Sequence, residues 1–309
     1  MKNLFQRWKM FYCLMVVSCM SPAALARGEG PTFSLGVGFE VASGKYGTGT
    51  SADSIYLPVT LAIYPTQRLG FSLEIPYVYQ SSSAVNTTVF TGSGARIMAG
   101  MRKQAAAMTG SPGGSGPAGG GTQGPPGTSG MSGTPGSMST ATTARSNESH
   151  GGLGDITAKA GYVLVPEGDL VPRVRPYVFV KFPTADRDNA LGTGEFDEGF
   201  AVEFSKLLGN WYFFAEAGYT FQGTSPLLPL KDYLSYSAGT GYIVGERFLP
   251  MFVLKGSGAP VEGADDLLEM RIKLKYLATS QTGIEGYVAK GVTRSTPDYG
   301  SGLAIFYDF

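Results

Sequence analysis

The chain has 309 residues, of which 45 are glycine, 12% are aromatic and only 16% are charged. Basic and acidic residues balance at 24 each, so the composition gives no support to a nucleic-acid-binding surface. One histidine and two cysteines argue against a histidine-rich metal centre, a zinc finger or a disulfide scaffold. A chain so poor in charge and rich in aromatic residues either buries most of its surface or faces a medium other than water.

The N-terminus has the pattern of a secretory signal peptide spanning residues 1–26. A basic region, Lys2–Lys9, precedes the apolar stretch Met10–Met20, and the small-residue sequence Ala24–Ala26 offers a cleavage site. The alternative is lipid attachment at Cys19. Either reading sends the protein out of the cytoplasm. The later sequence lacks the roughly 18 consecutive apolar residues of a membrane-spanning helix.

Alternation of apolar and polar residues predicts twelve β-strands in the remaining chain. The predicted strands are Phe33–Val41, Ile55–Ile63, Leu69–Gln80, Ile156–Leu164, Val174–Phe182, Phe200–Phe204, Trp211–Phe221, Leu234–Val244, Phe248–Leu254, Leu268–Tyr276, Ile284–Val288 and Leu303–Phe309. Strands of about ten residues suit a tilted crossing of a membrane.

The connections between these strands alternate between short and long. The short ones are Pro65–Arg68, Pro166–Pro172, Leu208–Asn210, Gly245–Arg247 and Ala278–Gln281. The long ones lie around Ser43–Asp53, Ser81–His150, Pro183–Glu195, Gly223–Lys231, Gly256–Asp266 and Gly291–Tyr299. This alternation is typical of an all-β fold, an up-and-down antiparallel transmembrane β-barrel whose termini are periplasmic and whose long loops are extracellular.

Each predicted strand has one apolar and one polar face. In a membrane barrel the polar face lines the lumen, whereas a soluble barrel reverses the arrangement. The predicted lumen-lining residues are Glu74, Asp155, Lys159, Arg175, Tyr177, Phe179, Lys181, Glu203, Tyr212, Phe214, Glu216, Glu269, Arg271, Lys273 and Lys275. Their charges either select solutes or neutralise one another in a plug of side chains, since twelve strands make a narrower barrel than the 16 to 18 of open porins.

Aromatic residues near strand ends on the apolar face fit the girdles of a membrane barrel. These residues are Tyr64, Tyr77, Tyr79, Trp211, Tyr276 and Tyr307. The chain also ends in an alternating strand with a terminal aromatic residue. Its outward residues Leu303, Ile305, Tyr307 and Phe309 are predicted to act as the signal for the barrel-assembly machinery.

A set of short motifs follows in one order between residues 152 and 221. They are Gly152-Leu153-Gly154-Asp155, Val180-Lys181-Phe182-Pro183-Thr184, Leu191-Gly192-Thr193-Gly194 with Asp197, Phe204-Ser205-Lys206, and Leu208-Gly209. This order resembles the family of outer-membrane proteins named for the MetA pathway of phenol degradation. The resemblance implies an outer-membrane barrel described as a transporter and linked to aromatic compounds. The insertion at residues 81–150 departs from the family pattern.

That insertion contains glycine at every third position over much of residues 110–138. Such spacing is typical either of a flexible, solvated loop or of a short collagen-like triple helix, because only glycine fits the axis of the triple helix. The second interpretation would join three barrels into a homotrimer.

The sequence contains no convincing catalytic constellation. His150 is the only histidine and was expected at the end of a flexible loop, and no serine lies in a nucleophile elbow. The acidic residues Asp186, Asp188, Glu195, Asp197 and Glu198 were expected to be exposed, but they lack the spacing of a calcium loop. We therefore expect no enzyme activity, no metal and no cofactor.

Together these patterns predict a channel in the outer membrane of a Gram-negative bacterium, in contact with membrane lipid. Small solutes, including aromatic or apolar ones, would diffuse through a lumen gated by extracellular loops. The alternative is a non-conducting barrel that acts as a scaffold or adhesion platform through its Gly-rich loop.

Overall fold

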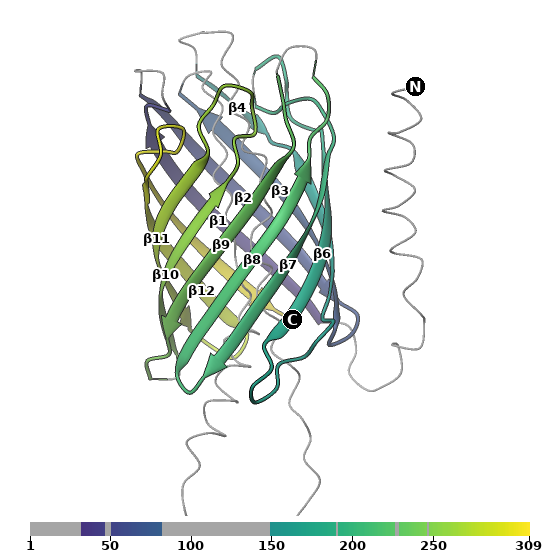
Figure 1. Ribbon diagram of the computed structural model, residues 1–309, viewed down its shortest axis with the longest axis vertical. Coiled ribbons are helices and arrows are strands. Elements are labelled where there is room, and N and C mark those ends of the chain that lie inside the picture. The colour runs from purple at the N-terminus through teal and green to yellow at the C-terminus, as the bar shows by residue number, and fades with distance from the viewer. Residues whose placement is uncertain (1–31, 47–50, 82–148, 190, 226–228, 246) are drawn as a thin grey trace, which may run out of the picture.

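The computed structural model describes residues 32–46, 51–81, 149–189, 191–225, 229–245 and 247–309, which form a closed β-barrel (Figure 1). Its strands are β1 (Thr32–Gly44), β2 (Ala52–Tyr64), β3 (Leu69–Gln80), β4 (His150–Leu153), β5 (Ile156–Tyr162), β6 (Arg173–Phe182), β7 (Asp197–Leu208), β8 (Trp211–Phe221), β9 (Tyr233–Tyr242), β10 (Phe248–Ser257), β11 (Leu267–Leu277), β12 (Thr282–Gly291) and β13 (Tyr299–Asp308). The predicted signal peptide and the Gly-rich segment lie outside the described residues.

Each strand pairs antiparallel with its neighbours, and β13 closes the ring by pairing with β1. The segments β4 and β5 share one position in the wall because both pair with β3. The described residues therefore build twelve strand positions, and the predicted all-β transmembrane barrel is confirmed. Among the same residues, no helix has the length and hydropathy needed to cross a membrane.

A β-bulge separates β5, which falls within the predicted strand Ile156–Leu164, from β4, which the sequence did not predict as a strand. Tyr77 pairs with Leu153 and Glu74 pairs with Thr157, so three steps along β3 correspond to four along its partner. The bulge lies opposite Pro76, which has no N–H to donate and only accepts a hydrogen bond, at 2.8 Å, from the Gly154 N–H. An extra residue reverses which positions face inward.

The connections place the short turns at one end of the barrel and the longer loops at the other. The turns comprise residues 65–68, 163–172, 209–210, 243–247 and 278–281; the loops comprise residues 45–51, 81–149, 183–196, 222–232, 258–266 and 292–298. The expected contrast in length has one exception, because the turn at 163–172 is longer than the loops at 45–51, 258–266 and 292–298. Short turns identify the periplasmic end.

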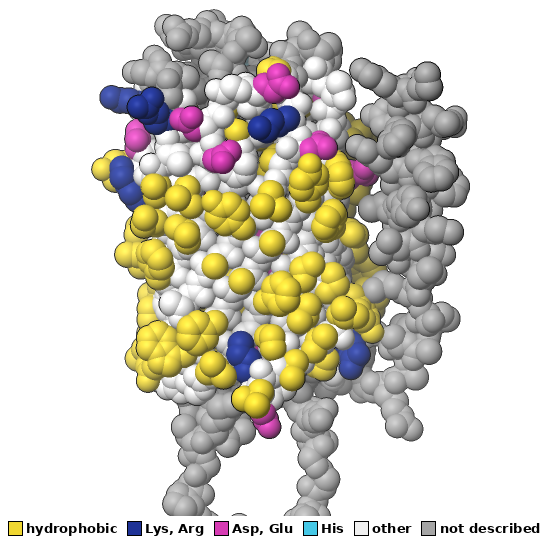
Figure 2. All heavy atoms as spheres, in the orientation of Figure 1, with side chains coloured by type: hydrophobic (Ala, Val, Ile, Leu, Met, Phe, Trp, Pro, Cys, Tyr) yellow, Lys and Arg dark blue, Asp and Glu magenta, His cyan; other side chains and the backbone are white. Residues whose placement is uncertain are grey.

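The outer surface of the strands is apolar. Large apolar side chains such as Val37, Leu61, Phe200 and Ile272 are exposed, while charged side chains on the same strands are buried inside. Figure 2 shows the hydrophobic side chains as a broad band across the visible face of the barrel, with charged side chains gathered mainly above it. This arrangement is that of a wall facing hydrocarbon, so the lipid-facing interpretation replaces the soluble one.

Aromatic side chains pair with one another at both edges of the apolar band. At the periplasmic edge the ring pairs are Trp211–Tyr242 at 5.1 Å, Phe248–Tyr276 at 4.7 Å and Tyr307–Phe309 at 4.8 Å. At the other edge they are Phe182–Phe196 at 5.8 Å and Tyr219–Phe221 at 5.0 Å. These two girdles fit the two membrane interfaces, where aromatic rings are favoured.

Tyr64 is an exception among the predicted girdle residues, and its assignment to the outer face was wrong. It continues the inward positions of β2 after the buried Tyr56, and its ring lies over Gly70 on the neighbouring strand. Because Gly70 has no side chain, the wall leaves room for the ring inside the barrel.

The last strand presents the predicted assembly residues to the outside. Leu303, Ile305, Tyr307 and Phe309 are all exposed on the outer face, whereas Ala304 and Phe306 between them are buried. The strand bearing these residues is also the one that closes the barrel against β1.

The lipid-facing assignment can be tested at Ile272, which is 64% exposed in the middle of β11. We expect Ile272→Arg to lower the free energy of unfolding in phospholipid vesicles by about 2–4 kcal/mol, the usual cost of such a charge near the membrane midplane. Urea titration followed by the fluorescence of Trp211 measures it. Ser280→Arg, in the turn at 278–281, is the matched control; an equal loss in both variants would contradict the assignment.

Candidate functional site: the charged interior of the barrel

The inner wall holds the residues that the sequence placed in the lumen. Glu74 lies on β3, Asp155 in the bulge, Lys159 on β5, Arg175, Tyr177, Phe179 and Lys181 on β6, Glu203 on β7, Tyr212, Phe214 and Glu216 on β8, and Glu269, Arg271, Lys273 and Lys275 on β11. Asp155, Phe214 and Lys275 are half-buried, and the others are buried. Their strands place them around most of the barrel circumference.

Several buried charged residues were missed from the sequence. Glu40 and Glu285 lie on β1 and β12, where glycine and alanine at other inward positions weaken the alternation. Arg173 and Lys255 lie one residue beyond the predicted strand ends. A longer strand prediction would have included Arg173 and Lys255, whereas Glu40 and Glu285 already lay inside predicted strands.

Opposite charges pair between and within the strands of the inner wall. The Arg175 Nη1 atom lies 2.9 Å from the Glu203 Oε2 atom on the neighbouring strand. Arg271 pairs with Glu269. Glu285 forms ion pairs with Lys273 and with Lys275, whose Nζ atom lies 3.4 Å from the Glu285 Oε2 atom. These pairs lower the cost of holding charge within a narrow space.

The strand register aligns polar groups into a continuous row, which we call the charged belt. Successive partners across β6 to β11 are Arg175, Glu203, Glu216, Ser237, Lys255 and Glu269. Elsewhere on the wall, tyrosines bind carboxylates: the Tyr287 hydroxyl donates to Glu40 at 2.8 Å and the Tyr56 hydroxyl donates to Glu74 at 2.6 Å. The inner wall therefore presents both positively and negatively charged side chains to the interior of the barrel.

An apolar cluster, the lower patch, lies between the charged belt and the periplasmic end. It comprises Leu207, Tyr212, Ile243, Leu249, Met251, Val253 and Leu277, with Phe214 packed against them. The rings of Tyr212 and Phe214 stack at 6.2 Å with an interplanar angle of 22°. Such a surface inside an otherwise polar barrel is suited to apolar or aromatic groups.

A second apolar cluster, the upper patch, runs along the inner wall from the loop at 183–196 at the extracellular end to Phe306 in the periplasmic half of β13. Its wall residues are Tyr56, Val78, Tyr287, Ala289, Ala304 and Phe306, and it includes Ala185 and Leu191 from the loop at 183–196. Because Leu191 is buried and a side chain at Gly152 of β4 would meet its Cδ1 atom at 2.9 Å, this loop folds against the inner wall instead of extending into solvent.

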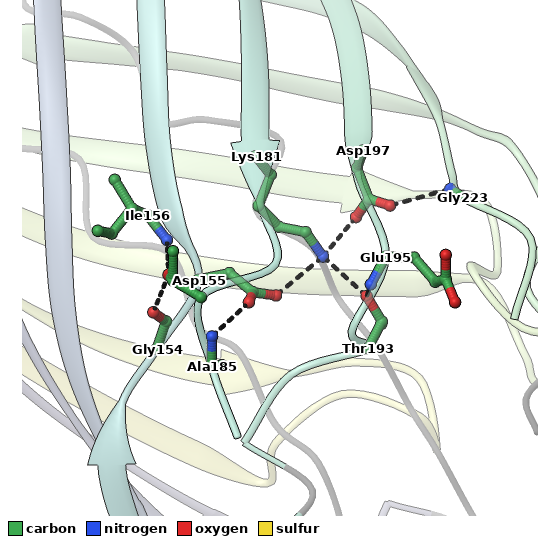
Figure 3. Close-up of polar contacts among 10 residues, drawn as sticks. Gly154, Asp155, Ile156, Lys181, Ala185, Thr193, Glu195, Asp197 and Gly223 are labelled. Atoms are coloured by element: carbon green, nitrogen blue, oxygen red, sulfur yellow. Dashed lines mark hydrogen bonds and ion pairs between the residues drawn. The ribbon is translucent and has the colours of Figure 1, made fainter. Parts of the chain in front are cut away.

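Lys181 connects this loop to the barrel wall (Figure 3). Its Nζ atom lies 3.1 Å from Asp155 Oδ2, 2.7 Å from Asp197 Oδ2 and 3.1 Å from the Thr193 hydroxyl oxygen. The carboxylates in turn accept backbone N–H groups, Asp155 from Ala185 at 3.0 Å and Asp197 from Gly223 at 3.1 Å. One ammonium group thereby fastens the bulge, the loop and the start of β7.

Two glycines allow the loop to close on this lysine. A side chain at Gly192 would meet the Ala185 Cβ atom at 2.7 Å and the Asp155 carboxylate at 2.8 Å. Gly194 adopts a φ of 71°, in the left-handed region that other residues rarely occupy. Each residue of the motif Leu191-Gly192-Thr193-Gly194 thus has its own role in the loop. Leu191 is its buried tip and Gly192 allows the close approach to Asp155. The Thr193 hydroxyl binds Lys181, and Gly194 makes the turn.

The expected exposure of the loop acids was wrong for Asp197, which is 1% exposed and paired with Lys181. Asp186 and Asp188 are exposed as expected. Asp186 accepts hydrogen bonds from the backbone and side chain of Asn189 and from the Asp188 backbone, which lower the pKa of its carboxyl group. These hydrogen bonds hold the turn that follows Asp186 in the loop.

His150 also differs from its expected environment. It begins β4, where it pairs with Gln80 of β3, and is half-buried. The residue therefore belongs to the barrel wall instead of ending a flexible loop.

Comparison with known proteins places these features in a family. A family model described as "Putative MetA-pathway of phenol degradation" matches residues 115–309. An outer membrane channel from Pseudomonas putida F1 is similar in structure, with 14% identity, a TM-score of 0.57, and coverage of 94% of this chain and 99% of that chain. The KdgM porin in complex with disordered oligogalacturonate is similar at 8% identity, with a TM-score of 0.48 and coverage of 89% and 99%. No curated protein sequence matches this chain significantly.

The role of Lys181 can be tested by replacing it with methionine. Lys181→Met leaves Asp155 and Asp197 buried without their ammonium partner, so we expect a loss of about 3–5 kcal/mol of stability. We also expect faster trypsin cleavage after the exposed Arg187, because the loop detaches from the wall. Lys231→Met removes an exposed lysine from another extracellular loop and is the control. Equal cleavage rates in the two variants would refute the anchoring role.

Proposed function

Because the chain belongs to the family described as the MetA pathway of phenol degradation, we propose that the barrel is a channel for the passive uptake of small solutes. The observation that carries this proposal is the inner wall, where a charged belt across β6 to β11 and two apolar patches line the interior. Charged groups inside a membrane protein mark the pathways of solutes and ions, since burying them without such a use is costly. Diffusion along this pathway needs no catalytic group and no cofactor.

The two patches favour solutes that carry an aromatic or apolar part. Tyr212 and Phe214 offer a stacked pair in the lower patch, and Tyr56 and Phe306 offer rings in the upper patch. On the same inner wall the charged belt presents both carboxylates and cations. A small solute with an apolar ring and a polar substituent meets a matching surface at each level, whereas a purely apolar solute does not.

The loop at 183–196 supplies the constriction in this proposal. It packs Leu191 against the upper patch and is fastened through Lys181 to two carboxylates. A loop held inside the barrel by buried ion pairs narrows the pathway permanently, so selection by size occurs at the upper patch.

We place the channel in the outer membrane of a Gram-negative bacterium. The apolar band and its two aromatic girdles support this location. Export by the signal peptide at residues 1–26, and recognition of Leu303, Ile305, Tyr307 and Phe309 by the barrel-assembly machinery, complete the proposal.

The alternative is a non-conducting barrel that serves as a scaffold or adhesion platform. It rests on the glycine period at residues 110–138, which a collagen-like association of three chains would explain.

Bilayer conductance separates the two functions. We expect discrete single-channel steps from the purified mature chain and from a variant lacking residues 110–138, because the proposed pathway runs through the interior that the barrel wall encloses. Steps in both forms would assign conduction to the barrel itself. Silence in both forms would contradict the channel and favour the scaffold.

The solute preference can be tested with two amino acids that do not cross lipid unaided. We expect the double substitution Tyr212→Ser and Phe214→Ser to lower the permeability ratio of phenylalanine to serine about two- to ten-fold, since one aromatic contact contributes about 0.5–1.5 kcal/mol. Swelling of protein-containing liposomes measures the ratio. Phe213→Ser removes an outward ring from the same strand and should leave the ratio unchanged. An unchanged ratio in the double variant would remove the lower patch from the pathway.

A further inference from the structure

The motif Phe204-Ser205-Lys206 places a lysine on the lipid-facing side of β7. Lys206 pairs in register with Phe213, between the exposed Phe204 and Leu208. A charge on this face is unfavourable in contact with hydrocarbon. The side chain is nevertheless only 12% exposed, so another part of the chain covers it.

The turn between β5 and β6, residues 163–172, covers the Lys206 side chain. The Lys206 Nζ atom lies 3.0 Å from Glu167 Oε1 and donates to the Gly168 carbonyl oxygen at 2.8 Å. The same Glu167 oxygen accepts the Leu207 N–H at 2.7 Å. Because β6 begins at Arg173, opposite Ser205, it does not extend to Leu207, and the Glu167 carboxylate takes the place of a strand there. The turn is thus held sideways against the outer surface of the barrel.

The tip of this turn exposes two apolar residues beside one acid, Asp169. Leu170 is 89% exposed and Val171 is 51% exposed, and a hydrogen bond of 3.0 Å from the Gly168 N–H to the Val171 carbonyl oxygen closes the tip. Figure 1 shows the turn at the lower rim, below β6 and β7. An exposed leucine beside the periplasmic girdle extends the apolar band of the barrel beyond the strands.

We propose that residues 163–172 form a membrane anchor that inserts Leu170 and Val171 into the inner leaflet of phospholipid. The turn is continuous with the lipid-facing wall, and its contact with Lys206 directs it along that wall and not away into the periplasm. The Lys206–Glu167 pair neutralises its own charges, and the turn presents apolar side chains outward in their place. Inner-leaflet lipid fits this surface, because the neighbouring wall is already covered by lipid.

The proposal depends on the transmembrane fold and is independent of conduction. Its test uses the full mature chain in vesicles whose acyl chains carry bromine near the headgroups. In a Trp211→Phe background, we expect Leu170→Trp to give blue-shifted emission that bromolipid quenches and aqueous iodide does not. Ser280→Trp, in the turn at 278–281, is the control and should be quenched by iodide.

A second variant tests the clamp. Adding Lys206→Met and Glu167→Gln to Leu170→Trp should reduce bromolipid quenching about two-fold, because the turn is no longer held against the wall. Emission from Leu170→Trp that matches the Ser280→Trp control would overturn the proposal and favour a periplasmic protein as the partner of this turn. Quenching that persists in full in the second variant would overturn the role of the clamp.

Discussion

Backbone hydrogen bonding in hydrocarbon is the constraint on which this structure depends. An unpaired N–H or C=O group costs several kcal/mol where no water can reach it, so a membrane-spanning sheet must leave no edge. Here β13 meets β1 over ten consecutive residue pairs, from Ser34–Asp308 to Ser43–Tyr299, and the ring is complete. Closure also gives every strand one face toward lipid. A slip of one residue in β1 would therefore turn the buried Glu40 toward hydrocarbon, which makes the register a strong determinant of the interior.

The same constraint explains the ionic structure of the interior. Residues excluded from the lipid face collect inside a narrow barrel, where each charge needs a partner: Arg175 finds Glu203, and Lys181 finds two aspartates. The inward position of one of these aspartates, Asp155, follows from the bulge in the wall. Pro76 cannot donate a hydrogen bond, the partner strand bulges opposite it, and the added residue turns Asp155 toward Lys181. A local defect in pairing thereby anchors the loop.

The architecture could be predicted from the sequence because alternation is a local property. The strands at Trp211–Phe221 and Leu69–Gln80 were predicted with their observed ends. Strands whose inward positions hold glycine, such as β1, were predicted too short. The inward position of Glu40 on β1 was also not recognised. The buried state of Asp197, the inward ring of Tyr64 and the docking of Leu191 could not be predicted, because each depends on contacts between residues far apart in the chain.

Two lysines in the motifs that carry the family resemblance have parallel roles at opposite ends of the barrel. Lys181 fastens an extracellular loop to the inner wall, and Lys206 fastens a periplasmic turn to the outer wall. The glycines around residue 192 and the bulge at Gly154 serve the first of these contacts. The motifs therefore hold connections in place, whereas Tyr212 and Phe214, the aromatic pair of the lower patch, lie outside them. A barrel built in this way can change the residues that meet the solute without disturbing the contacts that shape the pathway, so membership of the family implies a common frame and leaves the solute to the residues of the two patches and the charged belt.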